Sequence, residues 1–169
     1  MAELKGSKTE NNLLEAFAGE SQANRKYLAF AEKADAEGQK QVAKLFRAAA
    51  AAETVHAHAH LRTVGGVGST EDNLKESIEG ETHEFVNMYP QMIEEAKSEG
   101  QDAALRSFEF ANEVEKVHAN LYQKAFDTLG NNETVDYYVC KVCGNTIEGE
   151  PHGPCPVCQA GPVAFFKVD

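Results

Sequence analysis

The sequence predicts a mainly α-helical protein, in which a four-helix bundle is followed by a small β domain held together by a metal ion. Four long stretches before residue 135 have apolar residues at helical spacing, and two of them contain the motif Glu-x-x-His, at Glu53 and Glu115. All four cysteines of the 169-residue chain follow position 135, in two Cys-x-x-Cys pairs. We therefore expect domains at residues 1–135 and 136–169, one of ordinary size and one small appendage.

The first helix is expected to begin after Ser7 and to stop at Gly38. Ser7 and Glu10 have the spacing of a capping box, and glycine commonly follows the last turn of a helix. Glu20 lies on the apolar side of this helix, and Tyr27 follows seven residues later on the same stripe. The alternative for a lone Glu there is a boundary residue with its carboxylate in water, and for Tyr27 a core aromatic.

The second helix is expected from about residue 39 to 64, ending at Gly65. Its alanine run, residues 48–52, leaves room for a neighbouring helix to approach closely. Positions three apart on a helix lie about 60° from each other around its axis. Glu53 and His56 therefore point the same way, as two ligands of one metal ion must.

The third helix is expected from about residue 71 to 98. Glu81 and Glu84 place two carboxylates on one face, although Glu84 taken alone has the alternative role of a solvated surface charge. Pro90 has no N–H to donate, so we expect the helix to kink or unwind just after Tyr89. Tyr89, like Tyr27 in the first helix, is either a hydrogen-bonding group near a site or a core aromatic.

The fourth helix is expected from about residue 101 to 129, stopping at Gly130. It carries Glu115 and His118 on one stripe with apolar residues. The polar residues 131–134 then form a short linker, after which helical periodicity is lost.

The four helices together offer ligands for a pair of metal ions. Glu20 and Glu53 are 33 residues apart, and Glu81 and Glu115 are 34 residues apart. These nearly equal spacings indicate that the second pair of helices repeats the pattern of the first. Two Glu-x-x-His pairs on facing helices, with one further Glu from each of two other helices, form the dimetal site of ferritin-like bundles. The sequence therefore predicts a ferritin-like four-helix bundle with a carboxylate-rich metal site.

The C-terminal segment is too short to fold around an apolar core alone. Its cysteines have the spacing C-x2-C-x11-C-x2-C, which presents four thiolates to one tetrahedral ion. They are Cys140, Cys143, Cys155 and Cys158. The aromatic residues on either side of these cysteines are expected in short strands that cover the metal ion. A structural zinc ribbon is the alternative, because zinc and iron accept the same four sulfurs.

Charge and hydropathy exclude several classes of protein. The chain has 16 Lys and Arg against 27 Asp and Glu, a net charge of −11, which disfavours nucleic acid and suits cations. No apolar run approaches the roughly 18 residues of a membrane span, and the first five residues contain no apolar signal segment. We expect a cytoplasmic protein, where paired cysteines bind metal rather than form disulfides.

The whole chain resembles the rubrerythrin family, in which a ferritin-like di-iron domain is fused to a rubredoxin-like domain. The matching motifs are residues 16–23, Glu53-x-x-His56, Gly80-Glu81-x-x-Glu84, Met88-Tyr89-Pro90, Glu115-x-x-His118 and the two cysteine pairs. The departures lie in the tail: Gln159 replaces the glycine usual after a rubredoxin's second pair, the pairs are closer together, and tryptophan is absent.

The resemblance implies a di-iron centre and one Fe(Cys)4 centre per chain. It implies that Glu53 and Glu115 bridge the two irons, and that His56 takes the place of a carboxylate on one iron upon reduction. The remaining implied ligands are Glu20, Glu81, Glu84 and His118.

By the same resemblance, the protein is a peroxidase that reduces hydrogen peroxide to water in oxidative-stress protection. Electrons are expected from NADH through a separate reductase, a donor such as rubredoxin and the thiolate-bound iron. A homodimer or larger homo-oligomer is expected, with each tail facing the partner's bundle. The alternatives are a ferroxidase or iron-handling protein, which Glu84 and the cysteine tail oppose, and a zinc-ribbon adaptor, which the Glu-x-x-His pairs oppose.

Overall fold

The computed structural model describes residues 4–169 and contains two compact units, each treated by itself. The N-terminal unit ends at Gly68 and the C-terminal unit runs from Ser69 to Asp169. The three residues before Leu4, part of the stretch expected to lack an apolar signal, lie outside the described residues. This division falls inside the expected first domain, and the assignment of domains at 1–135 and 136–169 stays a prediction.

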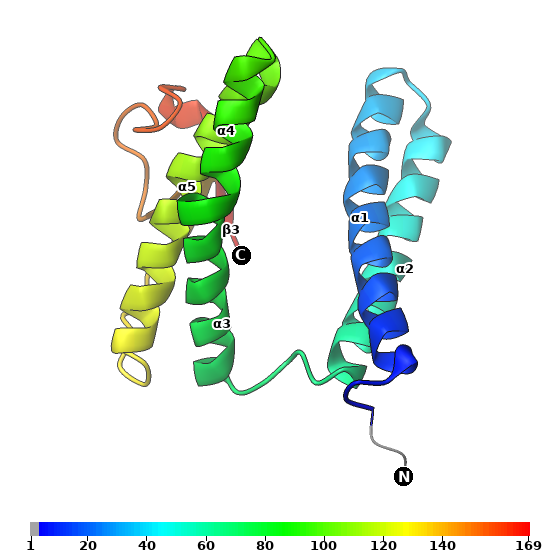
Figure 1. Ribbon diagram of the computed structural model, residues 1–169. Coiled ribbons are helices and arrows are strands. Elements are labelled where there is room, and N and C mark those ends of the chain that lie inside the picture. The colour runs from blue at the N-terminus through cyan, green and yellow to red at the C-terminus, as the bar shows by residue number, and fades with distance from the viewer. Residues whose placement is uncertain (1–3) are drawn as a thin grey trace. The chain divides into compact units, whose positions relative to one another are not determined.

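The N-terminal unit is a hairpin of two helices, α1 (Lys8–Ala36) and α2 (Lys40–Thr63) (Figure 1). As expected, Ser7 caps α1, its side chain accepting the Glu10 N–H at 3.1 Å. The turn between the helices uses Gly38 at φ 76°, a conformation that glycine adopts without steric cost.

The seam of this hairpin is made of alanines. The buried alanines are Ala31 and Ala34 on α1, and Ala43, Ala50 and Ala57 at seven-residue intervals on α2. These small side chains bring the backbones close enough for Asn24 Nδ2 on α1 to donate to the Ala50 carbonyl on α2 at 2.7 Å. Larger apolar residues such as Phe30 and Leu45 remain exposed, at 46% and 66%.

The C-terminal unit begins with a helix interrupted near its middle. A capping box between Ser69 and Asp72 starts α3 (Thr70–His83), which continues as the π-helical turn η1 (Glu84–Met88) and then α4 (Tyr89–Ser98). Pro90 lies in the first turn of α4, directly after the π turn, and its missing N–H removes one hydrogen bond from the continuous helix. The helix is irregular beside Pro90, as expected, but the irregularity is a π turn that precedes Tyr89 rather than an unwinding just after it.

The last helix, α5 (Asp102–Asp127), packs along α3 and α4. The buried side chains between these helices include Ile93, Ala96, Val114 and Ala119. All four helical stretches therefore lie close to their predicted bounds.

The tail forms a three-stranded antiparallel sheet in the order β2-β1-β3. Its elements are β1 (Tyr137–Cys140), β2 (Thr146–Glu148), the 3-10 turn η2 (Pro162–Ala164) and β3 (Phe165–Val168). Pairing Tyr138 with Ile147 on one side and Lys167 on the other fixes the register. The mainly helical fold with a small β domain is therefore confirmed. Among the described residues, no helix has the length and apolar character needed to span a membrane.

Candidate metal centres

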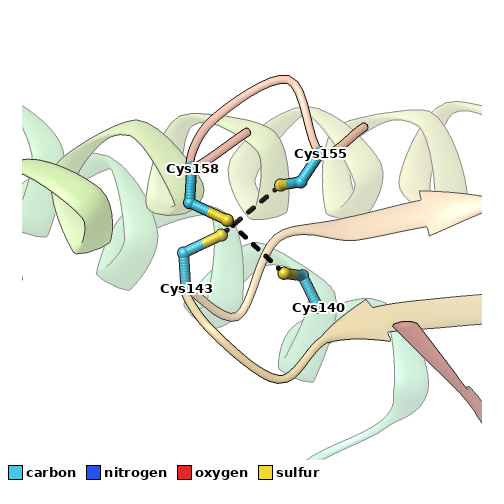
Figure 2. Close-up of side chains that lie close together, drawn as sticks. All are labelled: Cys140, Cys143, Cys155 and Cys158. Carbon is cyan, nitrogen blue, oxygen red and sulfur yellow. Dashed lines mark hydrogen bonds between the residues drawn. The ribbon is translucent and has the colours of Figure 1, made fainter. Parts of the chain in front are cut away.

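The four thiols of the C-terminal unit converge from two loops (Figure 2). The Sγ atoms of Cys140 and Cys158 are 3.6 Å apart, as are those of Cys143 and Cys155. A disulfide bond measures about 2.05 Å, so these cysteines are unbonded. Four sulfurs around one tetrahedral ion at about 2.3 Å lie about 3.8 Å apart. The observed spacing therefore fits a single thiolate-bound metal ion.

Both loops reach the thiols with the same backbone turn. The N–H of Gly144 donates to the Cys140 carbonyl at 2.8 Å, and the N–H of Gln159 donates to the Cys155 carbonyl at 2.9 Å. Gly144 has φ 83° and Gln159 has φ 62°. Gln159 thus holds a left-handed conformation that glycine would adopt more easily, which explains why glycine is usual at that position.

The thiols differ in how readily they ionise. Burial raises the pKa of Cys143 far above its usual value, against the backbone N–H of Asn145, which lowers it. Burial also raises the pKa of Cys158. At Cys140 burial is outweighed by hydrogen bonds, chiefly from the backbone N–H groups of Val142 and Cys143, and the pKa is lowered. A metal ion that binds all four sulfurs must therefore displace protons.

The N-terminal unit holds a second cluster, a triad of Glu20 on α1 with Glu53 and His56 on α2. The His56 Nδ1 atom lies 2.9 Å from Glu53 Oε2 and 4.0 Å from Glu20 Oε1. The hairpin turn places the two helices antiparallel, and the i, i+3 spacing on α2 aims both of its ligands at the Glu20 carboxylate.

The C-terminal unit repeats this triad with Glu81 on α3 and with Glu115 and His118 on α5. The His118 Nδ1 atom lies 2.8 Å from Glu115 Oε2 and 3.8 Å from Glu81 Oε1, close to the distances in the first triad. His118 is the less exposed of the two histidine side chains, at 27% against 55% for His56. Carboxylate and imidazole donors in this arrangement suit iron and other divalent metals.

Glu81 and Glu84 carry raised pKa values. The pKa of Glu81 rises to about 7 because of burial, a hydrogen bond with Glu115 and the negative charges of Glu115 and Glu84. Burial and the charge of Glu115 raise the pKa of Glu84. Carboxylates that resist ionisation because they are buried close to one another form a cluster that a cation would stabilise.

The two predicted tyrosines have different surroundings. Tyr27 packs in an aromatic cluster, its ring centroid 6.2 Å from that of Phe46 and 6.3 Å from that of Phe30. Tyr89 packs against Phe108, and burial together with the nearby charges of Glu115, Glu84 and Glu81 raises its pKa. Tyr89 therefore lies in the electrostatic field of the second triad.

One residue at the second triad was not expected from the sequence. Thr146, at the start of β2, places its Oγ1 atom 3.0 Å from His118 Nε2. The two residues are 28 positions apart, on a helix and on a strand of the tail. No periodicity or motif signals this contact.

Comparisons with known proteins agree with this geometry. The family profile described as rubrerythrin matches residues 11–126. Rubrerythrin-2 of Clostridium acetobutylicum is 36% identical over 172 residues, which cover 92% of this chain and 94% of the relative. Nigerythrin of Nitratidesulfovibrio vulgaris is 34% identical over 164 residues, which cover 89% of this chain and 81% of the relative.

Solved structures of nigerythrin are similar as well. A mixed-valence state has a TM-score of 0.58 at 34% identity, covering 99% of this chain and 91% of the other. A fully reduced, all-ferrous state has a TM-score of 0.59 at 32% identity, covering 98% of this chain and 91% of the other.

Proposed function

The chain belongs to the rubrerythrin family of iron-binding oxidoreductases, and from this premise we propose that it is a di-iron peroxidase that reduces hydrogen peroxide to water. The repeated triad is the observation that carries the proposal. Each unit presents two carboxylates and an imidazole at nearly equal distances. Two such sets together suit a pair of iron ions, which we propose Glu53 and Glu115 to bridge.

We assign seven residues as ligands of the iron pair. They are Glu20, Glu53, His56, Glu81, Glu84, Glu115 and His118. When bound, an iron pair supplies two electrons to one peroxide molecule, whose O–O bond breaks and which takes up two protons to give two waters. Glu81, whose pKa is raised to about 7, is partly protonated at neutral pH in the metal-free cluster, and metal binding would release that proton.

Two side chains support the peroxide reaction in other ways. The raised pKa of Tyr89 keeps its hydroxyl protonated at neutral pH, so that it remains a hydrogen-bond donor beside the second triad. The exposed His56 ring has room to exchange places with a carboxylate, which supports its role as an alternate ligand. Tyr27 is the weaker candidate for hydrogen bonding, because its ring is packed among phenylalanines.

The thiolate site gives the proposed enzyme its electron relay. We propose that residues 136–169 hold one iron, which changes charge with little ligand rearrangement and passes single electrons to the bundle of residues 1–135. The electrons would come from NADH through a separate reductase and a donor such as rubredoxin. Four unpaired thiols suit the reducing cytoplasm.

A ferroxidase or iron-handling role is the alternative function. Neither activity requires a relay, so the thiolate site would have no purpose in it. The carboxylate of Glu84, electrostatically coupled to Glu115, is likewise one more than the two triads require. Both observations favour the peroxidase.

We further propose at least a homodimer, in which two copies exchange their N-terminal units to complete the metal sites. Ferritin-like bundles join their two hairpins by one long crossover. Here the link from Thr63 to Thr70 spans seven Cα steps, about 25 Å when fully extended. In a bundle built from one chain, Glu53 and Glu81 would lie at the same level, ten residues before the link and eleven residues after it. At about 1.5 Å of helix per residue, the link would then have to span about 32 Å.

Mixing two inactive variants tests this exchange. Glu53→Ala and Glu115→Ala each disable every site of a homodimer. If units are exchanged, a dimer of one copy of each has one doubly altered site and one intact site, and about a quarter of the sites recover. No recovery after unfolding and refolding the mixture would refute the exchange, as would sedimentation of an active monomer.

A coupled assay tests the peroxidase proposal. Protein reconstituted with iron without oxygen should bind about three irons per chain, two at the carboxylates and one at the thiolates. It should then support peroxide-dependent NADH oxidation in the presence of a reductase and rubredoxin. Iron at the thiolates alone, without turnover, would contradict the proposal, whereas rapid iron uptake and oxidation by dioxygen without peroxide turnover would favour the ferroxidase.

A further inference from the structure

The β2 strand and the loop before it lie along α5 at three successive points. A Cβ atom added at Gly144 would lie 3.9 Å from Val114 Cγ1, Thr146 meets His118, and Glu148 pairs with Lys124, Oε2 to Nζ, at 2.6 Å. The ion pair is solvent-exposed and adds little stability. The middle contact is the one that reaches a candidate metal ligand.

The hydrogen-bonding partners of Thr146 define the direction of that contact. Its Oγ1 atom lies 3.3 Å from the Gly144 carbonyl, which can only accept, so the hydroxyl proton goes there. The same oxygen must then accept from His118 Nε2–H, 3.0 Å away. With Nε2 protonated, Nδ1 is the atom that can present its lone pair to a metal ion, which would displace the proton of the 2.8 Å contact between Nδ1 and Glu115 Oε2.

We propose that Thr146 is a positioning residue that holds His118 as the Nε2–H tautomer with Nδ1 aimed at the carboxylates, and that it joins this ring to the cysteine loop. The proposal rests on the proposed function, in which His118 binds iron. Histidine ligands commonly donate their second ring N–H to a fixed acceptor, and loss of that acceptor weakens metal binding.

The same contact gives a short route between the two kinds of metal site. Gly144 follows Cys143 directly, so the path runs from the Cys143 sulfur through the Gly144 carbonyl and the Thr146 hydroxyl to the His118 ring. Along it the thiolate-held ion would be oxidised by one electron and the carboxylate-held pair reduced by one. A rubredoxin-type donor would then restore the thiolate-held ion. The route lies within one chain.

Zinc binding to the full-length protein tests the positioning role without any peroxide chemistry. With zinc in the thiolate site, affinity for further zinc at the carboxylate site is measured by competition with a chelator. Thr146→Val should weaken this binding about tenfold, and Thr146→Ser should restore it to within twofold. Thr63→Val is the matched control, because the Thr63 hydroxyl donates to the Ala59 carbonyl of its own helix at 2.7 Å, away from both metal-binding triads, and it should change nothing.

The ring proton gives a second, independent signal. In zinc-loaded wild type and in Thr146→Ser, the His118 Nε2–H proton should exchange slowly with water in NMR spectra. That signal should be lost in Thr146→Val and identified by its absence in His118→Gln. Far-ultraviolet circular dichroism shows whether the valine variant folds. If it does not, Thr146→Ala takes its place and is compared with Thr146→Ser.

The outcomes separate this inference from the proposed function. Unchanged zinc affinity together with a persistent Nε2–H signal in the hydroxyl-free variant overturns the positioning role, whatever the peroxidase activity. The predicted losses support it even if the wild-type iron protein fails to reduce peroxide, in which case only the proposed function falls.

Discussion

Replacing Glu81 with glutamine should stabilise the metal-free protein at pH 8, although it removes a candidate iron ligand. The pKa of Glu81 is raised from 4.5 to about 7 by burial, by its hydrogen bond with Glu115 and by the charges of Glu115 and Glu84. A raised carboxyl pKa means that the folded state favours the protonated form. The protonated Glu81 side chain therefore contributes its full stability below pH 4.5, and this stability is lost as the pH rises through about 7.

The magnitude follows from the same shift. The difference between 4.5 and about 7 corresponds to at most about 3.4 kcal/mol. The side chain is 21% exposed and the cluster is open to water, so we discount this to about 1–2 kcal/mol. Glutamine has nearly the shape of the protonated acid and cannot ionise, so the variant should escape this loss at pH 8, and most of its difference from the wild type should disappear at pH 5.

Urea unfolding followed by circular dichroism at 222 nm measures the effect. Wild type and Glu81→Gln are compared at one protein concentration at pH 5 and pH 8, with the thiolate site loaded and the carboxylate sites free of metal. Glu109→Gln, an exposed change on α5, is the control and should have no effect at either pH. A Glu81→Gln variant no more stable than wild type at pH 8 would refute the claim that ionising Glu81 destabilises the metal-free fold.

Three further predictions concern single parts of the molecule. Glu84→Ala should lower peroxidase turnover without unfolding the helices, because both triads remain, and unchanged steady-state kinetics would make Glu84 an ordinary surface charge. A chain ending at Thr134 should keep its helices and, once chemically reduced with iron, should still be oxidised by one equivalent of peroxide. Its turnover with the reductase and rubredoxin should fall steeply, and intact donor-driven turnover would show that electrons bypass the tail. Gln159→Gly should stabilise the tail by about 0.5–1 kcal/mol by relieving the left-handed backbone, seen as a higher temperature for loss of the thiolate-iron colour, whereas Gly144→Ala should lower that temperature.

Local signals in the sequence were sufficient for most of the fold. Helix ends coincide with their caps and stop residues, because Ser7 and Gly38 act through backbone groups within a few positions of themselves. Each triad was also predictable, because the Glu-x-x-His spacing and the helix-pair repeat are local geometry. The π form of the turn before Pro90 was not, because the proline removes one hydrogen bond while packing against α5 decides how the chain accommodates it.

Two other contacts between distant segments could not be predicted from the sequence. The hydrogen bond between Thr146 and His118 depends on how the tail docks on α5, which no spacing encodes. The aromatic packing of Tyr27 could not be predicted either. Its spacing of seven residues from Glu20 predicts that both lie on one face of the helix, but not which side chains pack against Tyr27. Such features follow from tertiary packing, and they are also where ligand positioning is decided.

The reaction of the reduced protein with peroxide tests the central claim most directly. Full-length protein carrying iron in both kinds of site is reduced without oxygen and mixed in a stopped-flow instrument with one equivalent of hydrogen peroxide per iron pair. We predict rapid near-ultraviolet absorbance growth from the oxidised pair, with two irons oxidised for each peroxide consumed and no radical trapped. Slow oxidation no faster than with dioxygen, or one iron oxidised per peroxide with release of a trappable radical, would contradict a two-electron peroxidase.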